Sequence, residues 1–84
     1  MIYREYPAVF AVAKEGGYMV YFPDLKGCVT QGDTVEDAYK NAKEALHLYL
    51  DGMSETPKPT AADGIEPNAG GLVMLINADG TAAN

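Results

Sequence analysis

The chain has 84 residues, with six Lys and Arg, twelve Asp and Glu, and a formal net charge of −6. This length suits one domain, and the acidic excess disfavours binding to phosphate backbones and favours a basic partner, although it also serves solubility alone. No apolar run approaches the ~18 residues of a membrane-spanning helix, and one cysteine excludes an internal disulfide. These features predict a single-domain protein of the reducing cytoplasm.

Three strands are predicted in the first part of the chain. Residues 6–13 are apolar at nearly every position, which indicates a strand covered on both faces. Residues 18–22 are β-branched and aromatic, and the two glycines before them suit a hairpin turn. Pro23 cannot continue a central ladder, so it starts a corner that leads to a short third strand at residues 28–31.

One helix is predicted over residues 35–51. Thr34 suits the N-cap, the acidic residues that follow suit the positive end of the helix dipole, and Gly52 suits the C-terminal cap. Leu48 falls outside the apolar stripe and is expected to be exposed or at an interface. The stripe, at three- and four-residue spacing, comprises Val35, Ala38, Tyr39, Ala42, Ala45, Leu46, Tyr49 and Met53.

The last part of the chain holds a long connection and a fourth strand. Residues 54–71 contain three prolines and no periodicity, with Ile65 as the only large apolar side chain. Residues 72–76 are typical of a buried strand, and residues 80–84 are expected to form a disordered tail. We therefore expect one domain over residues 1–79, with the 54–71 loop within it.

Residues 16–46 resemble the HicB antitoxin family. They read GGYMVYFPDLKGCVTQGDTVEDAYKNAKEAL and contain an aromatic-rich strand, F-P-D-L-x-G-C, T-x-G-D-T and a helix that opens with acidic residues and alanines. The resemblance covers about residues 6–53, is weaker over 64–79, and is absent at the C-terminal end. It implies a truncated ribonuclease-H-like fold and a partner, the HicA toxin. That toxin is a small basic ribonuclease of double-stranded-RNA-binding fold that cleaves messenger RNA with a histidine.

The function that this resemblance implies is stoichiometric inhibition of the toxin, by occlusion of its active or RNA-binding face. Many members of the family also carry a C-terminal helix-turn-helix or ribbon-helix-helix segment that binds operator DNA. Residues 77–84 are too short and too polar for either, so no C-terminal DNA-binding domain and no direct nucleic-acid binding are expected. Two alternatives stay open: an orphan HicB-like binding and oligomerisation module without a toxin partner, and a residual ribonuclease-H-like nuclease.

The predicted fold class is α+β, in the order β-β-β-α-β, with a mostly antiparallel four-stranded sheet of order 3-2-1-4 and one helix on one face. A right-handed crossover would place the fourth strand parallel to the first. Because one helix covers only one face, the other face would expose apolar side chains and favour a homodimer or higher oligomer. The residues expected at that oligomer interface are Val9, Ala11, Leu48 and Met74.

No catalytic, cofactor or metal site is expected. A two-metal nuclease needs several converging carboxylates, whereas the predicted strands carry almost none. His47 lies on the polar helix face, and Cys28 has no base in evidence and suits a small buried hydrophobe. The corner after the second strand is either a plain turn or a contact surface. The residues expected to bind a partner there are Met19, Tyr21, Asp24, Leu25, Lys26 and Asp33.

Overall fold

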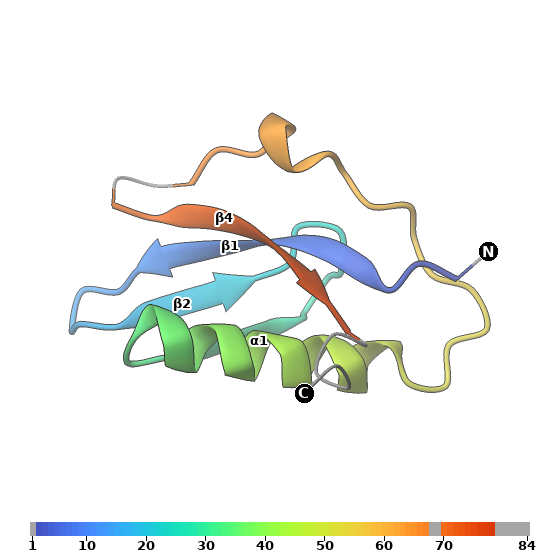
Figure 1. Ribbon diagram of the computed structural model, residues 1–84, viewed down its shortest axis with the longest axis horizontal. Helices are drawn as coiled ribbons and strands as arrows, with labels where there is room; N and C mark the ends of the chain where they lie inside the picture. The colour runs from blue at the N-terminus through green and yellow to red at the C-terminus, as the bar shows by residue number, and fades with distance from the viewer. Residues whose placement is uncertain (1, 68–69, 79–84) are drawn as a thin grey trace.

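The computed structural model describes residues 2–67 and 70–78, and its one sheet has the strand order β3-β2-β1-β4 with α1 on one face (Figure 1). The predicted class, strand order and single long helix are confirmed, with element ends that shift by one residue. The tail expected at residues 80–84 lies outside the described residues. The elements are β1 (Glu5–Val12), β2 (Tyr18–Tyr21), β3 (Val29–Gly32), α1 (Val35–Leu50), the 3-10 helix η1 (Ala62–Gly64) and β4 (Leu72–Asn77).

β4 runs antiparallel to β1, so the expectation of a parallel fourth strand is wrong. α1 leads the chain to one end of the sheet, from which a direct crossover would have started a parallel strand. The connection of residues 51–71 instead travels back along the sheet and delivers the chain to the opposite end (Figure 1). The length of this connection therefore reverses the direction of β4.

Pro7 lies inside β1, a central strand, where proline is uncommon because it has no N–H for the ladder. The N–H of Ala78 donates to the carbonyl of Arg4 at 2.8 Å, so the even-numbered residues of β1 direct their backbone groups toward β4. Pro7 therefore faces the β2 side, where the register places Pro23 opposite it, beyond the last residue of β2. No ladder bond is lost at this position.

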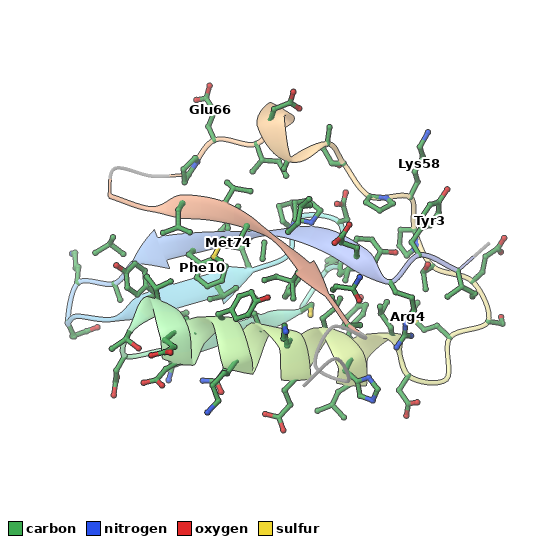
Figure 2. All side chains as sticks on the ribbon, viewed as in Figure 1. Tyr3, Arg4, Phe10, Lys58, Glu66 and Met74 are labelled. Atoms are coloured by element: carbon green, nitrogen blue, oxygen red, sulfur yellow. The ribbon has the colours of Figure 1, made fainter. Side chains whose placement is uncertain are left out.

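The main core lies between the sheet and α1. Phe10 and Met74 both sit in this layer (Figure 2). Leu50 joins the buried side of the helix, whereas Met53, which was predicted in the apolar stripe, follows the helix and is exposed. Leu48 is exposed, as expected. The buried cluster comprises Tyr6, Ala8, Phe10, Val20, Phe22, Leu25, Cys28, Ala38, Ala42, Leu46, Leu50, Ile76 and Ala78.

The sheet face away from α1 is covered over β1. Val9 is 1% exposed and Pro7 is fully buried, although neither belongs to the cluster beneath α1. The 51–71 connection lies along this side of the sheet (Figure 1). The expectation that Val9 is left in water is therefore wrong, and Ala11 is partly buried. Met74 was assigned to the same uncovered face but packs against the helix-side core instead.

The start of the connection is tied to the N-terminal strand region. The Thr56 hydroxyl accepts a hydrogen bond from the backbone N–H of Tyr3 and donates one to the carbonyl of Tyr3 at 3.1 Å. The Tyr6 hydroxyl donates to the carbonyl of Pro57. These bonds satisfy polar groups that the contact buries, and they hold the chain close to the sheet as it leaves α1.

Candidate functional site

The corner between β2 and β3 is a hydrogen-bonded turn rather than a loose loop. Its backbone N–H groups close three bonds, from Phe22 to the Cys28 carbonyl (3.2 Å), from Leu25 to the Phe22 carbonyl (3.0 Å) and from Cys28 to the Leu25 carbonyl (3.0 Å). Gly27 has a φ of 82°, which glycine adopts without steric strain. The corner is therefore a rigid support, and its apolar side chains face the core.

Two residues of the predicted partner surface, Leu25 and Asp24, have structural contacts in this corner. Leu25 is 1% exposed and belongs to the core, so a partner cannot reach it in the folded chain. The Asp24 carboxylate accepts hydrogen bonds from the Thr60 N–H at 2.9 Å and from the Thr60 hydroxyl at 2.6 Å. Asp24 therefore fastens the 51–71 connection to the corner.

Lys26 is exposed at the same corner, and its backbone is also fixed. The hydroxyl of Tyr49, a helix residue, donates to the Lys26 carbonyl at 2.9 Å. Tyr49 therefore packs its ring against the core and uses its polar end to hold the turn. The Lys26 side chain stays available for contact with another molecule.

An apolar strip lies open on the sheet face away from α1. Met19 is 46% exposed, Tyr21 42% and Val29 59%. The register places Tyr21 opposite Val29 on the neighbouring strand, and Met19 two residues from Tyr21 on the same face. We call these three residues the open strip. The 51–71 connection covers β1 but leaves the open strip in water.

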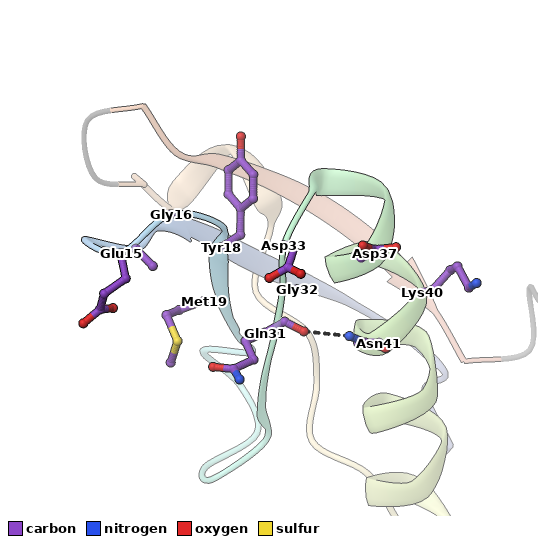
Figure 3. A pocket seen from close by; sticks show the side chains of 11 residues that line it. Glu15, Gly16, Tyr18, Met19, Gln31, Gly32, Asp33, Asp37, Lys40 and Asn41 are labelled. Carbon is purple, nitrogen blue, oxygen red and sulfur yellow. Dashed lines mark hydrogen bonds between the residues drawn. The ribbon is translucent and has the colours of Figure 1, made fainter.

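A hollow of about 570 Å³ continues from the open strip at the β1–β2 hairpin end of the sheet (Figure 3). Met19 belongs to both the hollow and the strip. The hollow is acidic, because its lining has three exposed carboxylates, Glu15, Asp33 and Asp37, and one lysine, Lys40. Asp33 was predicted to bind a partner. The lining residues are Ala13, Glu15, Gly16, Tyr18, Met19, Gln31, Gly32, Asp33, Asp37, Lys40 and Asn41.

The T-x-G-D-T pattern shapes one wall of this hollow. A Cβ on Gly32 would lie 2.3 Å from the backbone nitrogen of Ala38, closer than real atoms approach, so only glycine allows the end of β3 to contact α1. The Thr34 hydroxyl then accepts from the N–H of Asp37 at 3.0 Å and caps the helix. The sequence pattern predicts a helix start here and a partner contact at Asp33, but it gives no sign of the hollow.

The described side chains offer little for catalysis. Burial raises the pKa of the Cys28 thiol to about 11, so the thiol stays protonated and unreactive near neutral pH. His47 is exposed on α1. Within residues 2–67 and 70–78, no three His, Cys, Asp or Glu side chains are grouped to hold a metal ion, and no helix there has the length and apolar character to cross a membrane. The absence of catalysis stays a prediction.

Comparisons with known proteins converge on one family. The family model described as HicB-like antitoxin of bacterial toxin–antitoxin systems matches residues 6–81. Antitoxin HicB of Escherichia coli K12 is 34% identical over 83 residues, which cover 87% of this chain and 60% of that protein. A Helicobacter pylori protein described only as UPF0150 is 56% identical over 36 residues, which cover 43% of this chain and 50% of that protein. The chain thus spans about half the length of these curated relatives.

A solved structure adds a likeness in three dimensions. One chain of a structure described as the HicA3 and HicB3 toxin–antitoxin complex superposes with a TM-score of 0.66 and 26% sequence identity. The superposition covers 87% of this chain and 95% of that chain.

Proposed function

Because this chain belongs to the HicB-like antitoxin family of bacterial toxin–antitoxin systems, we propose that it binds and neutralises a small basic HicA-type ribonuclease. Support comes from its likeness to a chain of a HicA3 and HicB3 complex and from its net charge of −6. A basic RNA-cleaving protein presents positive charge where it meets phosphate, and an acidic protein can compete for that surface. The activity needs no reactive group on the antitoxin, so we propose inhibition and not catalysis.

The observation that carries the proposal is that the open strip adjoins the acidic hollow, with Met19 belonging to both. Exposed apolar and aromatic side chains are the kind that protein interfaces bury at their centre, and charged residues suit the rim. Met19 and Tyr21 supply the centre, while Glu15, Asp33 and Asp37 supply negative charge beside it. Complementary charge of this kind speeds association and selects a basic partner.

Lys26 belongs to the proposed surface as well, because the fixed corner presents its side chain near the end of β2. Asp24 and Leu25 act indirectly, since they hold the corner and the connection in place. The proposed contact surface therefore keeps only Lys26 at the corner, and it adds Glu15 and Asp37 at the hollow to the residues that the sequence predicted.

The test is a titration of RNA cleavage by a HicA-type toxin with increasing amounts of this chain. We expect cleavage to fall to zero at a fixed stoichiometric ratio. The double change Glu15→Gln and Asp33→Asn should slow association about tenfold at low salt, with a smaller effect at high salt. Glu44→Gln, which removes one charge from the exposed side of α1, is the control and should leave the association rate nearly unchanged. A chain that fails to inhibit at large excess would instead favour the orphan binding module.

A further inference from the structure

The cover on the sheet face away from α1 ends between two paired residues. Val9 of β1 and Tyr21 of β2 lie opposite each other in the ladder, so their side chains are neighbours on this face. Val9 is buried, whereas Tyr21 is exposed. The same row continues to Val73 on β4, which is partly buried, and to Val29 on β3, which is exposed. The border of the open strip therefore runs between β1 and β2.

The start of the 51–71 connection, residues 51–60, is fastened at two places. The hydroxyl of Thr56 exchanges hydrogen bonds with the backbone of Tyr3, beside the start of β1. The N–H and the hydroxyl of Thr60 donate to the carboxylate of Asp24, in the corner that directly follows β2. The second fastening therefore joins the connection to the end of the strand that carries Met19 and Tyr21.

The two fastenings differ in their exposure to water. Thr56 is 7% exposed, so its bonds with Tyr3 are shielded. Thr60 is exposed and Asp24 is only partly buried, so water competes for their hydrogen bonds. Exposed hydrogen bonds of this kind are the first to open in local fluctuations of a folded chain. The connection therefore has a closed state, with Thr60 bound to Asp24, and a locally open state in which Thr56 still holds.

We propose that toxin binding and closure of the connection at Asp24 favour each other. The inference rests on the proposed function, because it takes the open strip as the toxin-binding surface. A toxin seated on Tyr21 lies beside the corner and shields the bonds between Thr60 and Asp24 from water, which strengthens them. The closed connection in turn fixes the corner that presents Lys26. By linkage, the factor by which closure raises toxin affinity is also the factor by which the toxin favours closure.

The acceptor capacity of Asp24 allows the closed state to persist beside a basic partner. An ionised carboxylate has about four acceptor sites, and the two donors of Thr60 use only part of this capacity. A lysine or arginine of the toxin can therefore approach Asp24 without displacing Thr60. The opposite coupling, in which the toxin pulls Asp24 away from Thr60, would open the connection when the toxin binds, and the measurements below distinguish the two signs.

Amide hydrogen exchange of the full chain, free and saturated with a HicA-type toxin, measures the coupling. We expect the Thr60 amide to exchange about tenfold or more slowly in the complex. The Gly64 amide, which donates to the Ala61 carbonyl in η1, is the internal control and should exchange at nearly the same rate in both states. An unchanged or faster rate at Thr60, in a complex whose formation calorimetry establishes, would overturn the coupling and leave the proposed function intact.

Two substitutions at Thr60 distinguish coupling from simple cover by the toxin. Thr60→Val keeps the size of the side chain and removes the hydroxyl bond of 2.6 Å to Asp24, whereas Thr60→Ser keeps a hydroxyl and is the matched control. We expect Thr60→Val to raise the toxin dissociation constant about fivefold and Thr60→Ser to leave it nearly unchanged. In the free chain, Thr60→Val should also speed exchange of the Leu25 and Cys28 amides, which close the corner.

Equal toxin affinities of the two Thr60 variants would contradict the coupling, as would unchanged exchange at the corner amides of free Thr60→Val. The corner amides report on the connection without any toxin, so this part of the test does not depend on the proposed function. Failure of the parent chain to inhibit RNA cleavage would instead count against the proposed function itself.

Discussion

On the sheet face that points away from α1, strands β1 and β2 carry similar apolar side chains but differ in how far those side chains are exposed to water. β1 and β2 both carry large apolar side chains on this face. Val9 on β1 is buried to 1% exposure, whereas Met19 and Tyr21 on the neighbouring strand are exposed by 46% and 42%. The 51–71 connection runs along this side of the sheet and contacts β4 through η1 (Figure 1), and it leaves the side chains of Met19 and Tyr21 in water. A strand's apolar character therefore does not reveal whether it belongs to a core or to an interface.

The first and largest expected effect on stability comes from a glutamate placed on this face, either at Val9 of β1 or at Met19 of β2. Val9→Glu buries a carboxylate beneath the connection, so we expect it to lower the free energy of unfolding by about 3–5 kcal/mol or to leave a neutral, protonated side chain. Met19→Glu places the carboxylate on the open strip and should change stability by less than ~0.5 kcal/mol. Urea denaturation of the two variants measures both values.

Equal, small effects of these two substitutions would show that the connection does not cover β1 in solution. A large effect of Met19→Glu alone would reverse the assignment of the covered and open halves. Circular dichroism before denaturation establishes that each variant starts from the folded state.

The second expected effect concerns the bond that holds the connection in place. Asp24→Ala removes the acceptor of two hydrogen bonds from Thr60, and we expect a loss of about 1–3 kcal/mol together with faster proteolysis within residues 51–71. Asp33→Ala removes an exposed carboxylate from the hollow and serves as the control. Cleavage that is as slow in Asp24→Ala as in the parent chain would show that Thr60 is not the fastening point.

The third and smallest expected effect concerns the access of water to Cys28 in the core, beneath the strands that carry the open strip. Cys28 precedes β3 and faces α1, and burial raises its pKa from 9.0 to about 11. The folded chain then keeps the thiol proton where the unfolded chain loses it. This contribution to stability is fully present below pH 9.0 and is lost as the pH rises through about 11.

We therefore expect the stability of the parent chain to fall more steeply than that of Cys28→Ala between these two pH values. The two proteins differ only at residue 28, so the difference between their stability curves isolates the thiol. Parallel curves, or rapid reaction of the native thiol with a disulfide reagent near neutral pH, would mean that water reaches Cys28 from the open half.

Local signals made much of the fold predictable. The glycines before β2, Pro23, Thr34 and Gly52 mark turns and helix ends through backbone geometry that operates over a few residues. These signals led to the strands, the helix and the order β3-β2-β1-β4. The expected partner class came from the resemblance of residues 16–46 to the family pattern.

The errors came from contacts between distant residues. The direction of β4 and the burial of Val9 depend on where the connection attaches, and no residue pattern pairs Asp24 with Thr60 or Tyr3 with Thr56 in advance. The prediction that Asp24 binds a partner does not include its two hydrogen bonds with Thr60, and a role of Asp24 in partner binding stays a prediction. Met19, Tyr21 and Asp33 are exposed where the prediction needs them, but their role in binding stays a proposal.

The affinity of a HicA-type toxin for two lysine variants, determined by calorimetry, decides whether the open strip binds the toxin. Tyr21→Lys changes the open strip, and Leu75→Lys changes the β4 edge, at similarly exposed positions. We expect Tyr21→Lys to weaken toxin binding by at least tenfold and Leu75→Lys to leave the affinity per chain nearly unchanged. Equal affinities for both variants and the parent chain would contradict the assignment of the open strip as the toxin-binding surface.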